Sequence, residues 1–375
     1  MTNNMETTFI CHECSAELSA DEAYSFEGEH YCLDCLDEFT VICEHCGYRV
    51  REDYAHIDSR HTICNECFDD HYTYCESCEA IIATEDAFYL DEYDEYPYCR
   101  SCYQREVHHR KIHDYSYKPD PEFHGEGERY FGVELEVDKA GCDEDNAIEI
   151  LDIANDKPED RLYIKRDGSL NDGMELVSHP MTLDYHKNVM PWGEIMDRLV
   201  EMGYRSHKTS TCGLHCYINR TAFGKDYDEQ ESVIARILYF VEHHWAELLR
   251  FSRRTQAQME RWANRYGMKD KPKELMDDVK KRCSNRYTCV NILNYNTIEF
   301  RMFRGTLKYN TFIATLQLID SICDVAISMS DEEMPNLSWS EFVESLDKDK
   351  YPELITYLKE RNLYINEPVE SEEDA

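Results

Sequence analysis

The sequence has few basic residues for its length. Lys and Arg number 40 against 77 Asp and Glu, so the formal net charge is −37. A surface of this sign repels the phosphate backbone of nucleic acids over most of its area. A metal ion held by four thiolates leaves further negative charge and does not reverse the sign. We therefore expect no nucleic-acid partner.

Long apolar runs and a secretory signal are also lacking. No apolar run is long enough to span a bilayer, and the opening MTNNMETTF has neither the basic nor the apolar region of a signal peptide. These absences predict a cytoplasmic protein without membrane contact. In a reducing compartment, paired cysteines are more often metal ligands than disulfides.

Cysteine and glycine divide the 375 residues into two regions. Most of the 18 cysteines precede position 103, whereas glycines and longer apolar strings come mostly after position 125. A chain of this length also exceeds what one core usually organises. We predict zinc modules at 1–105, a polar linker at 106–128, a catalytic domain at 129–365 and an acidic tail at 366–375.

Six C-x-x-C pairs form an internal repeat. Alternate pairs begin at positions 11, 43 and 75, which are 32 residues apart, and each repeat contains two pairs. Two pairs can direct four thiolates at one ion in the tetrahedral arrangement that Zn(II) prefers. The predicted zinc ligands are Cys11, Cys14, Cys32 and Cys35; Cys43, Cys46, Cys64 and Cys67; and Cys75, Cys78, Cys99 and Cys102.

Pairing within a repeat and cross-braced pairing between repeats both complete these shells. We favour pairing within a repeat, because each repeat already contains a full ligand set. A redox dithiol or an iron–sulfur site is disfavoured by six pairs in register. The array predicts three zinc-ribbon or treble-clef-like modules whose folding depends on metal, and closed sites of this kind suit a partner-binding role rather than chemistry.

The second region alternates pairs of strands with helices, which predicts an α+β domain with a mostly antiparallel sheet. We expect strands at 130–138, 161–166, 174–178, 212–219, 286–293 and 297–303. Helices are expected at 144–155, 184–202, 228–252, 255–266, 272–282, 310–329, 338–346 and 351–360.

The segment FGVELEVD places two carboxylates side by side. Alternation along a strand puts Glu134 and Glu136 on one face and Val133, Leu135 and Val137 on the other. Adjacent carboxylates repel each other, so they require either a solvated face or a divalent cation between them.

Three further segments carry polar groups inside apolar strands. They are KRDGSLNDGMELVSHP with Asp167 and Glu175, CGLHCYINR with His215, and TIEFRMFRGTL with Glu299 and Arg301. Burying such groups without partners is expensive. We therefore expect them to satisfy one another around a charged ligand.

The order G-x-E-x-E, D-G-S, G-x-E-L-V-S-x-P, C-G-L-H and E-F-R-x-x-x-G-T resembles the amidoligase family over residues 129–365. The resemblance implies a glutamine-synthetase-like fold, ATP, Mg(II) or Mn(II), and an amide bond made through an acyl phosphate. It also implies site roles: Glu134, Glu136, Glu175, His215 and Glu299 lining a metal–nucleotide funnel, and Arg301 and Arg304 contacting phosphates.

Three positions qualify this assignment. Relatives commonly have a second histidine where this chain has Tyr217, a poor magnesium ligand, so Tyr217 is expected to bind substrate or to pack. Arg304 lies on the opposite strand face from Arg301 unless a bulge occurs near Phe303. Asp167 either orients the incoming amine or stabilises its own turn.

The sequence thus predicts an ATP-dependent carboxylate–amine ligase whose zinc array recruits a protein or peptide, with a small-molecule amine or amino acid as the alternative substrate. Two rivals are a phosphotransferase on the same fold and a non-enzymatic zinc-dependent adaptor. The motifs for metal and phosphate are largely present, which disfavours the adaptor.

Overall fold

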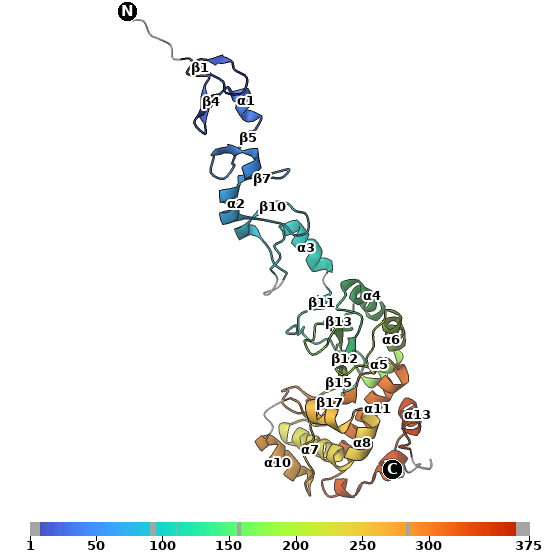
Figure 1. Cartoon of the computed structure of the whole chain (residues 1–375). Helices are drawn as coiled ribbons and strands as arrows, with labels where there is room; N and C mark the ends of the chain where they lie inside the picture. Colours follow the sequence, from blue (N-terminus) through green and yellow to red (C-terminus); the bar gives the residue numbers. More distant parts are fainter. Residues whose placement is uncertain (1–7, 91–94, 110, 156–158, 283–285, 365–375) are drawn as a thin grey trace, which may run out of the picture. The chain divides into compact units, whose positions relative to one another are not determined.

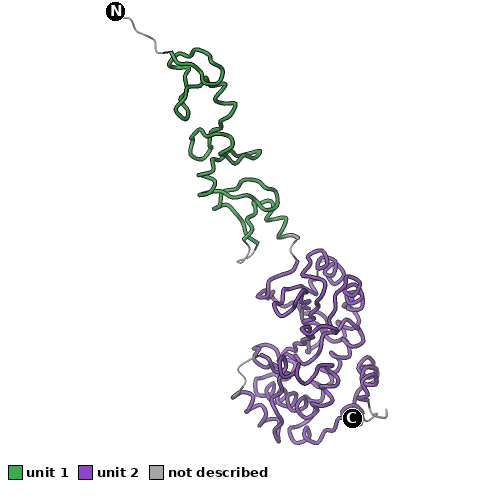
Figure 2. The backbone as a smooth tube through the Cα atoms, in the orientation of Figure 1, with its two compact units in different colours: residues 1–110 green, residues 111–375 purple. Residues whose placement is uncertain are grey.

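The chain divides into two compact units, residues 1–110 and 111–375, in the computed structural model (Figure 2). The structure describes residues 8–90, 95–109, 111–155, 159–282 and 286–364. The acidic tail predicted at 366–375 lies outside the described residues.

Each repeat of the first unit combines antiparallel hairpins with a helix (Figure 1). The first repeat holds β1 (Phe9–Ile10), β2 (Glu17–Leu18), β3 (Tyr24–Phe26), β4 (Glu29–Tyr31) and α1 (Leu33–Asp37). The second holds β5 (Thr40–Ile42), β6 (Arg49–Arg51), the 3-10 helix η1 (Glu52–Tyr54), β7 (Ala55–Ile57), β8 (Thr62–Cys64) and α2 (Asn65–His71). The third holds β9 (Tyr72–Tyr74), β10 (Ile81–Ala83), η2 (Thr84–Asp86), a bridge between Phe88 and Tyr98, and α3 (Arg100–His109).

The backbone repeats with the same period as the cysteines. Ser15, Gly47 and Glu79 have positive φ angles of 60°, 75° and 58°. Each donates its N–H to the carbonyl of the residue four positions earlier, at 2.8 to 3.0 Å. The first cysteine pair of every repeat therefore lies in one kind of tight turn, and the second pair lies at the start of a helix. This arrangement is treble-clef-like, since a zinc ribbon would place both pairs on hairpins.

The second unit is a mixed helix and sheet structure around a mostly antiparallel sheet. Its seven described strands lie in the order β11-β13-β14-β12-β15-β17-β16, and only the β11–β13 pairing is parallel. Their bounds are β11 (Ile112–His113), β12 (Phe131–Asp138), β13 (Leu162–Lys165), β14 (Gly173–Ser178), β15 (Gly213–Asn219), β16 (Val290–Asn291) and β17 (Thr297–Arg304).

Helices of the second unit lie between and after these strands. They are α4 (Glu144–Ala154), α5 (Leu183–Asn188), α6 (Trp192–Glu201), η3 (Arg220–Phe223), α7 (Tyr227–His243), α8 (Trp245–Ser252), α9 (Gln256–Trp262), α10 (Pro272–Arg282), α11 (Tyr309–Ser328), η4 (Met334–Asn336), α12 (Trp339–Glu344) and α13 (Pro352–Glu360).

The sheet has one apolar face. Val133, Leu135 and Val137 of β12 are fully buried and join one core cluster with side chains of α4, α6 and α11. Because successive side chains of a strand point to opposite faces, the glutamates between these residues point to the other face. Packing of the apolar face therefore positions the polar face of the same strand.

Two expected helices are broken and one expected strand is short. The helix predicted at 184–202 divides at Pro191, which has no N–H to continue the hydrogen-bond ladder. The helix predicted at 228–252 divides at His244, whose φ and ψ of −102° and 32° leave the helical region. The strand predicted at 286–293 is reduced to β16.

Part of the segment predicted as a linker at 106–128 has regular structure in the described residues. Helix α3 continues to His109, and β11 adds an edge strand to the sheet of the second unit, where Ile112 is fully buried. The N–H of His124 also donates to the carbonyl of Pro180, at 3.0 Å. A two-residue strand inside a polar segment has no periodicity, so the sequence analysis missed it.

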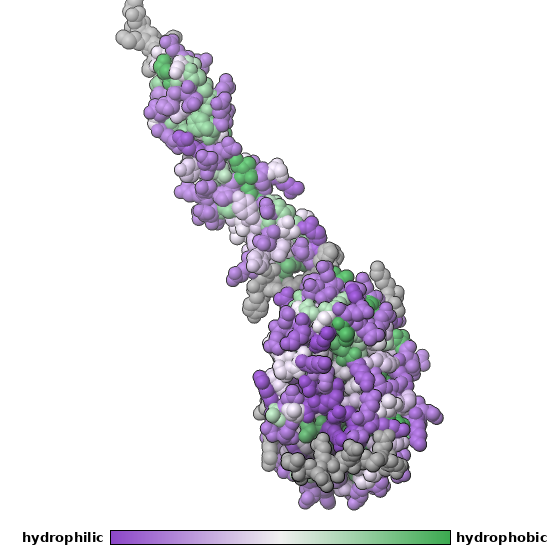
Figure 3. Space-filling model, turned by 45° about the vertical axis from the view of Figure 1, so that its right-hand side comes forward, coloured by the Kyte–Doolittle hydropathy of each residue, from purple (hydrophilic) through white to green (hydrophobic). Residues whose placement is uncertain are grey.

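Helix α11 corrects the expectation that no run could span a bilayer. By length and composition alone this helix is long and apolar enough, and 78% of its most apolar 18-residue window is buried inside the structure. Its contacts with α7 and α13 account for that composition. Outside the core, hydrophilic residues dominate the visible face of each unit, and hydrophobic residues form scattered patches (Figure 3).

We predict that the second unit loses stability as the pH falls from about 6.5 to 4. His186 is fully buried, accepts a hydrogen bond from Trp192 Nε1 and contacts the carbonyl of Phe131. Burial lowers its pKa to about 4, so only the unfolded chain takes up a proton in this range, which costs about 3 kcal/mol for one such group.

Denaturant unfolding followed by tryptophan fluorescence tests this, because all four Trp lie in the second unit. His186→Gln should be less stable at pH 7 but should show a shallower decline towards pH 4. An unchanged decline in that variant would contradict the assignment.

Candidate functional site

The three cysteine groups each come from one repeat. Within each group the four sulfur atoms lie within 4.8 Å of one another, and each group contains both pairs of its own repeat. The pairing is therefore sequential rather than cross-braced. Sequential pairing follows from the fold of a single repeat, which brings its turn and its helix start together.

The sulfur positions fit a tetrahedral zinc ion. A Zn–S bond of about 2.3 Å places tetrahedral sulfurs about 3.8 Å apart, whereas a disulfide requires about 2.05 Å. The distances are 3.8 Å for Cys11–Cys32 and 3.9 Å for Cys14–Cys32, Cys46–Cys64 and Cys78–Cys99. The backbone N–H groups of Cys14 and Cys32 lower the pKa of Cys11 to about 6, which favours the thiolate that binds metal. These groups could each hold one zinc ion.

Removal of one cysteine group should remove one zinc ion. We predict three zinc ions per chain by elemental analysis, and two when Cys43, Cys46, Cys64 and Cys67 are all replaced by Ser. Cross-braced pairing would break two sites and leave one ion. Tryptophan fluorescence of the second unit should not change, which controls for general unfolding.

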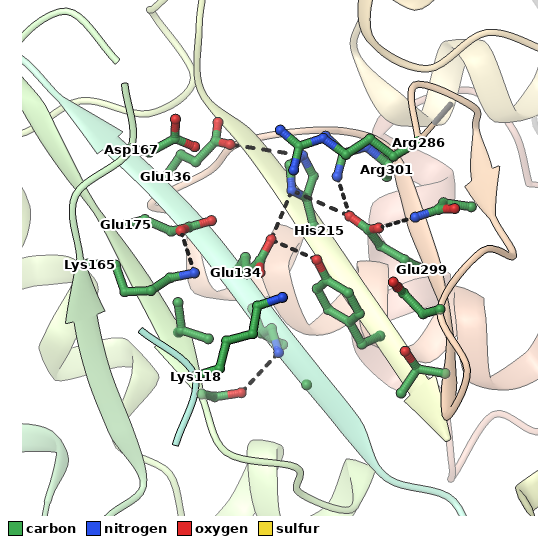
Figure 4. A pocket seen from close by; sticks show the side chains of 18 of the residues that line it. Lys118, Glu134, Glu136, Lys165, Asp167, Glu175, His215, Arg286, Glu299 and Arg301 are labelled. Carbon is green, nitrogen blue, oxygen red and sulfur yellow. Dashed lines mark hydrogen bonds and ion pairs between the residues drawn. The ribbon is translucent and has the colours of Figure 1, made fainter. Parts of the chain in front are cut away.

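The second unit contains a cavity of about 750 Å³ on the polar face of its sheet. Side chains from neighbouring strands converge there (Figure 4). Those predicted from the sequence that line it are Glu134, Glu136, Asp167, Glu175, His215, Glu299 and Arg301. Segments separated by more than 160 residues in the chain thus meet in one site.

His215 lies at the centre of the carboxylates. Its Nδ1 is 3.2 Å from Glu134 Oε2 and 3.8 Å from Glu299 Oε1, and its Nε2 is 3.9 Å from Glu136 Oε1. Figure 4 shows these three carboxylates around the imidazole. The side chains of Glu136 and Glu299 are only 5% and 2% exposed, so water solvates them poorly.

Two overlapping groups have the spacing of a metal site. Glu134, His215 and Glu299 form one, and Glu136, Glu175 and His215 form the other, each with one ligand atom per residue within 4.8 Å of the rest. A neutral imidazole has one unprotonated nitrogen. His215 can therefore coordinate in one group while its other nitrogen donates to a carboxylate of the second, a common arrangement around metal ligands.

The carboxylates have divergent proton affinities. Burial alone would raise the pKa of Glu134, but contacts with His215 and Lys165 and a hydrogen bond from Tyr217 lower it to about 2. Burial and the neighbouring Glu134 raise the pKa of Glu175 to about 9, and burial raises that of Glu136. Without a cation, the site thus disfavours full ionisation of its carboxylates. A bound divalent cation would stabilise the ionised carboxylates and lower their pKa values.

Cationic side chains line the same cavity. Lys165 Nζ lies 3.3 Å from Glu175 Oε2, and Arg301 pairs with Glu299. Asn291 donates to Glu299 Oε2 at 2.8 Å. The Nε of Arg301 is buried and has no hydrogen-bond partner in the described part of the chain. An unpartnered guanidinium nitrogen beside metal-type carboxylates suits a ligand with anionic oxygens.

The bulge required for Arg304 is present, but Arg304 does not join the cavity. Leu214 pairs with Phe303 and Cys216 with Phe300, so two residues of β17 lie opposite His215 alone. Arg304 then pairs with Gly213, on the face of His215. Its guanidinium nevertheless contacts the carbonyls of Thr209 and Arg253 and lines a neighbouring cavity.

Asp167 and Tyr217 have structural partners. Asp167 Oδ1 accepts the N–H of Ser169 at 2.7 Å, which stabilises its turn, while the residue also lines the cavity. The Tyr217 hydroxyl donates to Glu134 Oε2 at 2.9 Å. Tyr217 therefore orients Glu134, a candidate metal ligand.

Several lining residues were not predicted from the sequence. They are Tyr115, Lys118, Lys165, Arg254, Arg286, Tyr287 and Asn291. Lys165 had a weak signal, since it is a charged residue within the strand predicted at 161–166. Tyr115 and Lys118 fall in the expected linker, and Arg254 follows a helix, so no strand pattern marked them.

Gly213 allows two site residues to approach the backbone closely. A Cβ atom at this position would lie 2.8 Å from Arg254 Nη2 and 2.8 Å from His215 Nε2, which is closer than such contacts occur. The N–H of Gly213 also donates to Glu136 Oε2. An added methyl group would displace the imidazole or the guanidinium.

We predict that Gly213→Ala weakens Mn(II) binding at least tenfold in calorimetry without nucleotide, because the methyl group moves His215. Gly193→Ala is the matched control, since its Cβ would meet only Tyr309 Cδ2 at an ordinary 4.0 Å. Tryptophan fluorescence would establish that both variants are folded. Equal Mn(II) affinity of Gly213→Ala and the unmodified chain would contradict the metal assignment of His215.

One protein-family model matches a part of the second unit. Residues 148–323, less than half of the chain, match the family described as "Putative amidoligase enzyme". The matched segment includes Glu175, His215, Glu299 and Arg301 and begins after Glu134 and Glu136. An amidoligase, by its name, joins a carboxylate to an amine, so the match supports a carboxylate–amine ligase at this general level.

Similarity beyond the family is weak. No curated protein matches the chain. Among solved structures, a bifunctional glutathione synthetase from Pasteurella multocida is similar with a TM-score of 0.34 and 15% identity, over 62% of this chain and 46% of that chain. This chain thus spans less than half the length of that structure, and a similarity of this size establishes no shared fold.

Proposed function

We propose that the second unit is an ATP-dependent ligase that activates a carboxylate as an acyl phosphate and joins it to an amine. The observation that carries this proposal is the convergence on His215 of three buried glutamates and the half-buried Glu134, next to an Arg301 Nε that has no partner among the described residues. Such a site suits a divalent cation and a phosphate chain together. We also propose that the unit has a glutamine-synthetase-like fold and acts in the cytoplasm.

Mg(II) or Mn(II) fits the donor set of this cavity. Carboxylate oxygens are ligands that both ions accept, and an imidazole nitrogen is better suited to Mn(II). Glu134, Glu299 and His215, or Glu136, Glu175 and His215, would hold the ion. When bound, it would neutralise charge on the phosphates and on the transferred phosphoryl group.

The proposed reaction has two steps. A carboxylate oxygen of the substrate attacks the γ-phosphorus of ATP, so that a P–O bond to ADP breaks and a P–O bond to the carboxylate forms. The amine then attacks the carbonyl carbon, a C–N bond forms, and phosphate leaves. Arg301 would contact phosphate oxygens in the first step, and Asp167 would accept the amine proton in the second.

A second cavity supports a two-substrate reaction. It measures about 1290 Å³ and shares Gly132, Pro180 and Tyr217 with the first cavity. Its walls include Phe123 and Phe223. A substrate or nucleoside with apolar surface would fit there and reach the charged site past Tyr217, as in sites where a few polar groups orient a mostly apolar ligand.

The zinc unit is proposed to recruit a protein or peptide substrate. It exposes many large apolar side chains for its size, as recognition surfaces do. Those more than half exposed are Ile10, Ile42, Tyr48, Tyr54 and Tyr96. A small amine or amino acid is the alternative substrate, and it would leave this surface without a role in catalysis.

The ligase proposal predicts metal-dependent nucleotide binding. Calorimetry with ATP and Mg(II) or Mn(II) should show binding to the unmodified chain and at least tenfold weaker binding to Glu134→Gln and Glu299→Gln, which keep the side-chain shape but lose the charge. Glu149→Gln is the matched control, because Glu149 pairs with Arg198 on an exposed helix surface. No binding at millimolar nucleotide would favour the adaptor instead.

Product analysis separates the ligase from a phosphotransferase. Hydroxylamine can replace the amine, and a ligase should then form a hydroxamate and ADP from a panel of amino acids and Glu-containing peptides. A phosphotransferase would release ADP and a stable phosphorylated product without hydroxamate. The second result would overturn amide formation while leaving the nucleotide site intact.

A further inference from the structure

A cavity of about 480 Å³ lies next to the candidate active site and shares Arg254 with it. His207, Arg250, Arg253, Arg254, Arg304 and Arg361 line it, and we call it the basic cavity. Among the described residues that line it, none is acidic. The whole chain has 77 acidic and 40 basic residues. A cavity lined by five arginines and no carboxylate therefore differs strongly from the composition of the chain.

The five guanidinium groups have no ion pair with a carboxylate in the described part of the chain. The hydrogen bonds of Arg253, Arg254, Arg304 and Arg361 go to backbone carbonyls, and Arg253 Nη1 also lies 3.1 Å from His207 Nδ1. Arg253 donates to the carbonyl of Arg304 at 2.8 Å, Arg361 to that of Arg250 at 2.8 Å, and Arg254 to that of Phe303 at 3.2 Å. These bonds orient the side chains without neutralising their charge, and Glu136 of the candidate active site acts electrostatically on Arg254.

Part of the hydrogen-bonding capacity is unused. The Nε atoms of Arg253, Arg254 and Arg304 are buried and have no partner within the described residues. Unpaired buried donors are costly, so their persistence in a cluster points to a ligand that accepts from them. Burial, then Arg253, lowers the pKa of His207, as expected where cations gather.

The backbone also holds Arg253 in an unusual conformation. It ends α8 with φ and ψ of 62° and 14°, in the left-handed region that favours glycine. A non-glycine residue there is held by its surroundings at some cost in stability. The arginine side chain is therefore retained at a position where glycine would suit the backbone better.

We propose that the basic cavity is a second binding site, for a multiply charged phosphate anion of the pyrophosphate class. Guanidinium groups match phosphate oxygens through paired hydrogen bonds. A phosphate group carries about −1.5 to −2 charge at pH 7, so it compensates several arginines better than one carboxylate does. The site is separate from the nucleotide position proposed above, and it does not depend on that proposal.

Arg254 connects this site to the candidate active site. It is 8% exposed and lines both cavities. Its charge also acts on Glu136. An anion in the basic cavity would bind Arg254 from one side, while the carboxylates of the candidate active site attract Arg254 from the other side. Occupancy of one site would therefore change the charge balance of the other site.

Calorimetry with pyrophosphate and with inorganic phosphate tests the proposal on the full, zinc-loaded chain without nucleotide. We expect one pyrophosphate per chain and weaker binding at higher salt. Arg253→Gly should weaken it at least tenfold without lowering thermal stability, since glycine relieves the left-handed conformation. Arg361→Gln should have the same effect on binding, and Arg198→Gln, on an exposed surface, should have none.

Two outcomes would overturn the proposal. One is no pyrophosphate binding at millimolar concentration, or equal binding by Arg253→Gly and Arg361→Gln. The other is displacement of pyrophosphate by a non-hydrolysable ATP analogue with Mn(II), because displacement would assign the arginines to the phosphates of the nucleotide itself. Undiminished pyrophosphate binding beside the bound analogue would support a second site.

Discussion

The arrangement of carboxylates around one imidazole is the constraint on which the second unit depends. Glu134, Glu136 and Glu299 lie within 4 Å of His215, and their burial makes mutual repulsion strong. Lys165 and Arg301 offset part of that repulsion from neighbouring strands. The sheet tolerates the remainder because its opposite face buries an extensive apolar core. Stability from one face thus permits a charged site on the other.

The two units are stabilised in different ways. Each zinc module has a small core, with clusters such as Leu18, Tyr31 and Leu36 around Cys11, so metal ligation must supply much of the folding free energy. The second unit has one extensive apolar core, whose burial supplies folding free energy without metal ligation. This difference agrees with the donor sets, which are cysteines that could hold zinc in the first unit and carboxylates that could hold a cation in the second.

Charge is segregated over short distances in a chain that is acidic overall. The candidate active site and the basic cavity share Arg254, and the β-bulge opposite His215 separates Arg301, which lines the first, from Arg304, which lines the second. A regular strand would have put these two arginines on opposite faces of the sheet. The bulge keeps both arginines on the same face, where each contacts different neighbours. The sheet thus has two adjacent sites, which suit anionic and cationic ligands.

The sequence alone determined the groups of cysteines that could hold zinc. The 32-residue period and the C-x-x-C spacing are local features, and they fix which four thiolates can reach one tetrahedral ion. The sequence also determined the mixed helix and sheet class and which glutamates share a strand face, since alternation is a property of the strand itself. Only the tertiary structure brought Lys118 and Arg254 to the site, because they lie in segments without periodicity. It likewise decided that the supposed linker adds β11 to the sheet and that Arg304 leaves the glutamate site, since strand pairing and a bulge are set by contacts between residues far apart in the chain.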